Sequence, residues 1–143
     1  MLATKTPEKI STSINEIMLN ASQAFNDYKK FSPEKKAIFL ETIADEIEAL
    51  GDALITQASE ETNLPAARLT GERARTTMQL RTFAAMVKEG SWVEASIDTS
   101  MPDRKPMPKP DIRKMMIPLG PVIVFGASNF PFAYSTAGGD TAS

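Results

Sequence analysis

The chain of 143 residues has the length of one ordinary domain, and its 42% hydrophobic and 24% charged residues are typical of a globular protein. A net charge of −2 excludes a broad basic surface for nucleic acid and a polybasic patch for membranes. Cysteine and histidine are both absent, so the chain itself supplies no thiolate nucleophile, no disulfide, no zinc–thiolate site and no imidazole base.

The N-terminus lacks the apolar segment of a secretory signal, because polar residues follow Met1 to Lys5. The longest apolar stretch, residues 115–127, is interrupted by two prolines and a glycine and is shorter than the roughly 20 residues that span a bilayer. We therefore expect a cytoplasmic protein without a membrane segment.

Residues 1–90 are predicted to be helical. The first helix begins with Thr6 as N-cap and Pro7 in the first turn, and it ends by Phe31. Ser32 and Pro33 start the second helix with the same chemistry, and the following glycine at position 51 ends it. Each helix carries one apolar face at helical spacing: Ile10, Ile14, Ile17, Met18, Ala21, Phe25 and Tyr28 in the first, and Ala37, Leu40, Ile43, Ala44, Ile47 and Leu50 in the second.

Asp52 is expected to cap a short third helix, which breaks at residues 63–65 because a residue before proline avoids the α region. A fourth helix follows from about Pro65 to Glu89 and ends at Gly90. Its apolar stripe consists of Leu69, Thr76, Leu80, Phe83, Ala84 and Val87. The carboxylates of these helices are interpreted as solvated, among them Glu41, Glu46 and Glu72. The arginines of the fourth helix are interpreted as partners of Glu72 or of neighbouring subunits: Arg68, Arg73 and Arg75.

The hydrophobic period changes after Gly90. Residues 92–97 and 112–117 are each predicted as a strand, and the segment between them, residues 101–110, holds four of the ten prolines and is predicted as a loop. We therefore expect a β-hairpin within residues 91–117. An unpaired strand edge of this kind tends to be covered by a partner, which favours a role in subunit assembly.

Residues 122–125 form a continuous apolar run after a turn at 118–121, as in a strand buried on both faces of a parallel sheet. Small residues at 126–128 then form a loop, and Pro131 opens a helix. A parallel partner strand needs a crossover of about a dozen residues, and none follows. The predicted fold class is therefore α/β, with residues 118–143 starting a Rossmann-like domain that this chain leaves unfinished.

A buried strand that leads through small residues into a helix is the general form of an α/β ligand site, because ligands bind outside the carboxyl ends of such strands. Residues 125–131 are the candidate site. The chain has neither a G-x-G-x-x-G motif nor a P-loop, and many α/β domains share this pattern without a ligand. From its chemistry alone, Asn129 is better explained as a turn or N-cap residue, which the proline two positions later favours.

At this point the sequence resembles the aldehyde dehydrogenase family. The segment P-L-G-P-V-I-V-F-G-A-S-N-F-P at residues 118–131 is similar to that family's strand followed by its N-F-P loop. The continuation A-G-G-D-T-A-S at 137–143 resembles the branch of α-ketoglutaric semialdehyde (2,5-dioxovalerate) dehydrogenases and NADP-dependent fatty aldehyde dehydrogenases. Residues 64–73 and 90–93 also look like that branch, so the resemblance covers most of the chain.

The resemblance implies roles for five residues. Asn129 would donate its side-chain amide to the oxyanion that forms when a cysteine thiol attacks the aldehyde carbonyl. Phe130 would line the substrate tunnel, with core packing as the other interpretation. Phe125, Gly126 and Ala127 would run beside the nicotinamide of NADP or NAD, and they are equally well explained as the end of a strand.

The resemblance also implies that the cysteine nucleophile, the glutamate base and the adenosine-binding strand lie beyond Ser143, so that this chain alone is inactive. The partners implied are a small-molecule aldehyde, the remainder of the dehydrogenase and further subunits in a homodimer or tetramer. No metal site, nucleic acid or membrane is expected. The alternatives are a non-catalytic helical protein-interaction module and a degenerate, non-catalytic remnant.

Overall fold

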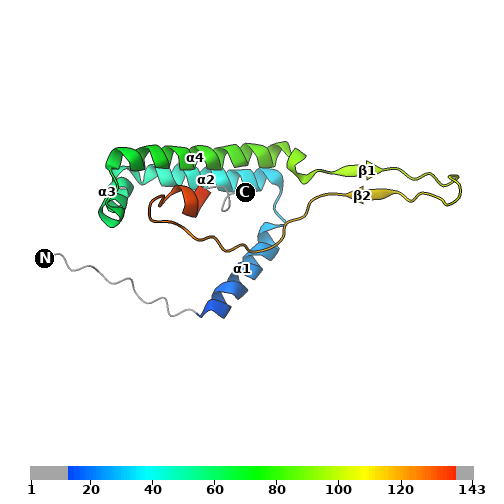
Figure 1. Ribbon diagram of the computed structural model, residues 1–143, viewed down its shortest axis with the longest axis horizontal. Coiled ribbons are helices and arrows are strands. Elements are labelled where there is room, and N and C mark those ends of the chain that lie inside the picture. The colour runs from blue at the N-terminus through cyan, green and yellow to red at the C-terminus, as the bar shows by residue number, and fades with distance from the viewer. Residues whose placement is uncertain (1–12, 138–143) are drawn as a thin grey trace.

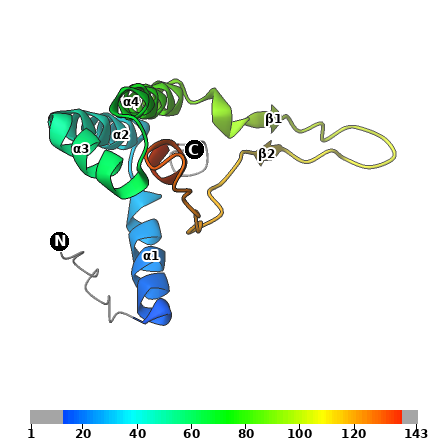
Figure 2. The same cartoon turned by 60° about the vertical axis from the view of Figure 1, so that its left-hand side comes forward.

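Two long antiparallel helices form the scaffold of the computed structural model, which describes residues 13–137. α2 (Pro33–Ala49) and α4 (Ala66–Glu89) lie side by side, and α3 (Gly51–Thr62) connects them at one end. α1 (Ile14–Tyr28) leads away from this pair, and the hairpin of β1 (Ser96–Asp98) and β2 (Ile112–Lys114) projects from its other end (Figures 1 and 2). A short π-helix, Ala133–Ala137, packs against α4. Within residues 13–137, no helix is long and apolar enough to cross a membrane.

Serine hydroxyls cap the first two helices. The Ser32 hydroxyl accepts a hydrogen bond from the amide of Lys35 at 3.2 Å, with Pro33 in the first turn, as the sequence predicts. Ser13 caps α1 in the same way, and α1 ends at Tyr28. The predicted start of this helix at Thr6 and Pro7 lies outside the described residues.

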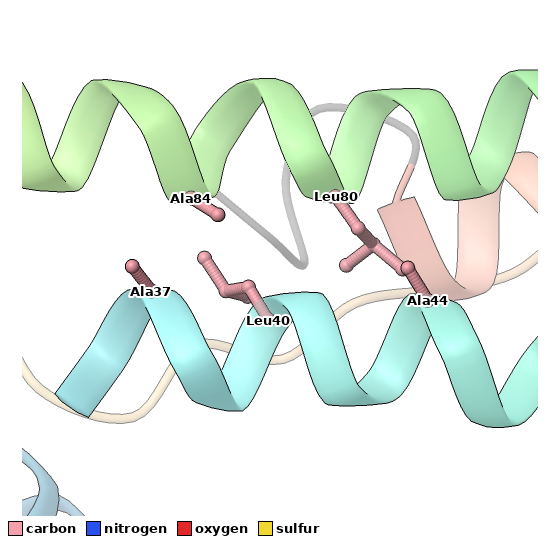
Figure 3. Packing of buried hydrophobic residues seen from close by; sticks show 5 residues of the cluster. All are labelled: Ala37, Leu40, Ala44, Leu80 and Ala84. Atoms are coloured by element: carbon pink, nitrogen blue, oxygen red, sulfur yellow. The ribbon is translucent and has the colours of Figure 1, made fainter. Parts of the chain in front are cut away.

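The apolar faces of α2 and α4 meet in the main core, although Leu50, predicted on the inward face of α2, is 56% exposed. Its buried members are Ala37, Leu40 and Ala44 of α2 and Leu80 and Ala84 of α4, and Figure 3 shows these side chains pointing toward one another. The three alanines let the two backbones approach closely, while the two leucines fill the space between them. Partly buried side chains surround this cluster: Ile43, Ile47, Phe83 and Val87.

α1 carries the predicted apolar pattern, but its residues remain uncovered. None of its side chains is buried, and Ile14 is 79% exposed. Only its C-terminal end contacts the scaffold, where the ring of Tyr28 lies 5.7 Å from the rings of Phe31 and Phe39. The partial burial of Tyr28 raises the pKa of its phenol. The apolar pattern therefore predicts the helix correctly, whereas residues 13–137 do not bury its apolar face.

The start of α3 differs from the prediction. Asp52 does not cap this helix but lies inside its first turn, because Gly51 already begins the helix and the N-cap residue, Leu50, makes no side-chain cap. Gly51 has a φ of 59°, a left-handed conformation that costs glycine little, so the chain can reverse within one residue. The carboxylate of Asp52 still lies near the positive end of the helix dipole.

The hairpin is confirmed, although its strands are shorter than predicted. β1 and β2 are antiparallel, with Ile97 opposite Arg113. Residues 92 and 93, predicted as the start of the first strand, instead belong to a 3₁₀ turn, Ser91–Val93. Gly90 and Glu94 both have positive φ, of 85° and 47°, and these reversals keep the chain from entering an extended ladder earlier.

The predicted strand at residues 122–125 is not formed. Residues 115–126 have no regular secondary structure in the described chain, and Phe125 is 88% exposed. A strand of a parallel sheet exists only when a neighbour pairs with its backbone, and the sheet of the described residues contains only β1 and β2. The α/β character of the structure therefore comes from the helices and the hairpin, and the first strand of a Rossmann-like domain is absent from residues 13–137.

A network of exposed charges links α2 to α4 beside the core. The Arg81 guanidinium binds both carboxylate oxygens of Glu48, at 2.7 and 3.0 Å, and contacts Asp45 at 2.7 Å. The hydrogen bonds from Arg81 lower the pKa of Glu48 from 4.5 to about 2, and those from Glu48 and Asp45 raise the pKa of Arg81.

We expect Leu80→Ala to destabilise the protein by about 2–5 kcal/mol, because the side chain is 1% exposed and its loss leaves a cavity between α2 and α4. Urea unfolding measures this change. Met78→Ala is the matched control on the same helix: its side chain is 58% exposed, so a change within about 0.5 kcal/mol is expected. Equal losses in the two variants would contradict the packing of these helices.

The Glu48–Arg81 pair predicts a specific pH dependence. Because the pKa of Glu48 is lower in the folded protein than its ordinary value of 4.5, its stabilising effect is complete above about pH 4.5 and disappears as the pH falls through about 2. The difference in unfolding midpoint between the wild type and Glu48→Gln should therefore shrink steadily over this range. A difference independent of pH would show that the ion pair does not form.

Candidate functional site

The candidate loop forms a tight turn at residues 127–130. The Phe130 amide donates a hydrogen bond to the Ala127 carbonyl at 3.1 Å, which places Ser128 and Asn129 at the two central positions. Asn129 is exposed, and its side-chain amide makes no hydrogen bond to another residue of the described chain. The turn interpretation is therefore correct for the backbone of Asn129. The N–H groups of its side chain donate to no other residue within residues 13–137.

Arg68, in the first turn of α4, holds the backbone of this turn. Its guanidinium donates a hydrogen bond to the Asn129 carbonyl at 2.6 Å and lies 4.9 Å from the centre of the Phe130 ring. The sequence suggested instead that Arg68 and Arg73 pair with Glu72 or with other subunits. Both arginines bind backbone carbonyls, since Arg73 donates to Gly51 at 2.6 Å.

Glu72 is the main correction to the sequence prediction. Its side chain was expected on a solvated face, but the residue is only 7% exposed. One carboxylate oxygen, Oε1, accepts hydrogen bonds from the amides of Phe132 at 2.8 Å and Ala133 at 2.9 Å. These amides precede or begin the short C-terminal helix, where the first N–H groups have no partner within the helix. The second oxygen, Oε2, is buried without a partner among the described residues.

Phe130 is packed between two elements. Its ring lies 4.8 Å from the Tyr134 ring in addition to its contact with Arg68, and the residue is partly buried. The core-packing interpretation of Phe130 therefore describes one of its faces. Its position in a substrate tunnel stays a prediction.

The three residues proposed to contact a cofactor differ in their surroundings. Phe125 is 88% exposed, whereas the carbonyl of Ala127 accepts the hydrogen bond that closes the turn. A Cβ atom added at Gly126 would lie 3.2 Å from Cβ of Ser135, closer than normal packing allows. A glycine at position 126 is thus explained without any ligand, because the missing side chain lets the loop approach the short C-terminal helix.

Arg68 and Glu72 were missed as members of the site, although the sequence contains a signal for one of them. Position 72 follows Leu69 by three residues and precedes Thr76 by four, so Glu72 lies on the buried stripe of α4. A carboxylate on such a stripe needs hydrogen-bond donors from elsewhere in the fold. The donors themselves, which lie 60 and 61 residues later, could not be identified without the structure.

Comparison with known proteins gives a consistent result. The model of the aldehyde dehydrogenase family matches residues 2–138. The chain is 58% identical over 123 residues to α-ketoglutaric semialdehyde dehydrogenase 2 of Azospirillum brasilense, and 52% identical over 121 residues to α-ketoglutaric semialdehyde dehydrogenase of Acinetobacter baylyi. These alignments cover 86% and 85% of this chain but 23% of each relative. The chain thus spans about a quarter of the length of the curated relatives it matches.

Proposed function

The chain belongs to the aldehyde dehydrogenase family, and from this premise we propose that its 127–130 turn binds the carbonyl oxygen of an aldehyde during oxidation to a carboxylic acid. The observation that carries the proposal is the exposed, unpaired amide of Asn129 on a turn whose backbone is held by α4. Attack of a thiol on the aldehyde carbonyl builds negative charge on its oxygen. A neutral amide placed beforehand at that oxygen stabilises the charge without losing its own proton.

The nucleophile and the general base of this reaction would be supplied by polypeptide outside the present sequence. The chain contains no cysteine, so a thiohemiacetal cannot form on any of its side chains. Glu72 is unsuited to the role of general base, because its carboxylate is buried and already accepts two backbone hydrogen bonds. On this proposal, residues 1–143 alone are inactive.

Residues 125–127 are proposed to lie beside a nicotinamide. The three residues are exposed, and the lack of a side chain at Gly126 and the small one at Ala127 would let a planar ring approach the backbone. NADP or NAD, when bound, would accept the hydride that leaves the aldehyde carbon. This chain would contribute only backbone contacts there, and it offers no residue that distinguishes the two cofactors.

The proposed substrate is a semialdehyde that carries a carboxylate, with a fatty aldehyde as the alternative. The support for the first is that both relatives are named α-ketoglutaric semialdehyde dehydrogenases. We further propose that the complete protein is a homodimer or tetramer in which the hairpin contacts another subunit. The hairpin exposes large apolar side chains, among them Ile97 at 66% and Met107 at 69%, which fits burial against a partner.

Substitution of Asn129 tests the proposed function. In the complete enzyme, Asn129→Ala should lower kcat for aldehyde oxidation by roughly 10²–10³-fold, because a donor to the developing oxyanion is lost. The matched control is Asn20→Ala, which removes an exposed asparagine of α1 and should leave kcat unchanged. Retention of wild-type kcat by Asn129→Ala would disprove the oxyanion role.

A further inference from the structure

We propose that Arg68 is a positioning residue for the reaction: together with Glu72 it forms a clamp on α4 that sets where the Asn129 amide lies. This proposal rests on the proposed function, because it concerns how that amide reaches the carbonyl oxygen. Neither residue contacts the reacting atoms on this view. Each acts through the backbone of the loop that carries Asn129.

The clamp consists of two opposite charges one helical turn apart. Arg68 and Glu72 are four residues apart in α4 and therefore project from the same face of the helix. The cation binds a carbonyl oxygen, that of Asn129, whereas the anion binds amides, those of Phe132 and Ala133. Hydrogen bonds in which one partner is charged are about twice as strong as neutral ones. The loop is thus held on both sides of the Phe130–Pro131 peptide.

The residues between the two contacts have little remaining freedom. Pro131 has a fixed φ and restricts the backbone of Phe130 before it. The Phe130 ring contacts both the guanidinium of Arg68 and the ring of Tyr134. Pro131 has no N–H group. The first N–H groups after Pro131 are therefore those of Phe132 and Ala133, and both donate to Glu72. Arg68 therefore restrains the backbone of Asn129 directly, at its own carbonyl.

The burial of Glu72 indicates that the clamp serves more than packing. An apolar side chain at position 72 would continue the stripe of Leu69 and Thr76 and would avoid the unpaired oxygen Oε2. It would also leave two amides without an acceptor. Arg68, in contrast, is exposed, so its removal leaves no buried charge and is expected to leave the protein folded.

The test uses Arg68→Met in the complete enzyme, because methionine retains an apolar chain beside Phe130 but cannot donate to the Asn129 carbonyl. We expect kcat to fall by roughly 10–100-fold, because displacing a catalytic group by about 1 Å can cost up to about 100-fold. The KM for the nicotinamide cofactor, NADP or NAD, and the thermal unfolding midpoint should remain near their wild-type values. Arg68→Lys, which retains a cationic donor, should recover part of the loss. Arg75→Met, an exposed arginine of the same helix, is the matched control and should be unchanged.

A double-mutant comparison separates positioning from a general structural role. If Arg68 acts through Asn129, then Arg68→Met should cause little further loss when Asn129 is already alanine. A full additional loss in that background, or an effect of Arg68→Met below twofold in the wild type, would overturn the clamp while leaving the role of Asn129 intact. If Asn129→Ala itself has no effect, the proposed function and the clamp both fail.

Discussion

The arrangement of the site depends on one interaction: the buried Glu72 carboxylate accepts hydrogen bonds from two backbone amides. It joins α4 to chain 60 and 61 residues later and, together with the contact of Arg68, attaches the described part of the C-terminal segment to α4. Burial of a carboxylate is unfavourable unless donors replace water, and the two amides are donors that a helix start leaves unpaired. The carboxylate thus gains the donors that it needs, and the two amides gain an acceptor. The loop that carries Asn129 has its position as a consequence.

That interaction requires a rigid α4, which the rest of the helical part provides. The core between α2 and α4 is built from alanines and leucines in close contact, and a second cluster of Ile55, Ala58 and Leu69 receives Leu64 and Phe132. Phe132 therefore contributes an apolar ring to this cluster while its amide binds Glu72. Apolar packing fixes the helix that carries the clamp, and the clamp fixes a loop that has no regular structure of its own.

The helices could be predicted from the sequence because their ends are set by neighbouring residues. The remaining features depend on contacts between residues far apart in the sequence. The hydroxyl cap and proline at Ser32 and Pro33, and the glycine at position 90, mark helix ends that the structure confirms. The strand at residues 122–125 could not be judged correctly from its apolar pattern, because a strand also needs a neighbour. The turn at Asn129 was among the interpretations open from the start. The attachment of that turn to Arg68 was not, since it joins residues 61 positions apart.

In the proposed reaction this chain supplies the oxyanion donor but neither the nucleophile nor the base, and this follows from what each type of group requires. A nucleophile and a base must change protonation or bonding state during the reaction, whereas an oxyanion donor must stay in place and unchanged. An amide suits the second role because it does not titrate, but it is effective only if its position is set before the substrate arrives. A loop cannot provide that by itself, and here two charged side chains of one helix hold its backbone on either side of a proline. The helical scaffold therefore takes part in the proposed chemistry through geometry alone.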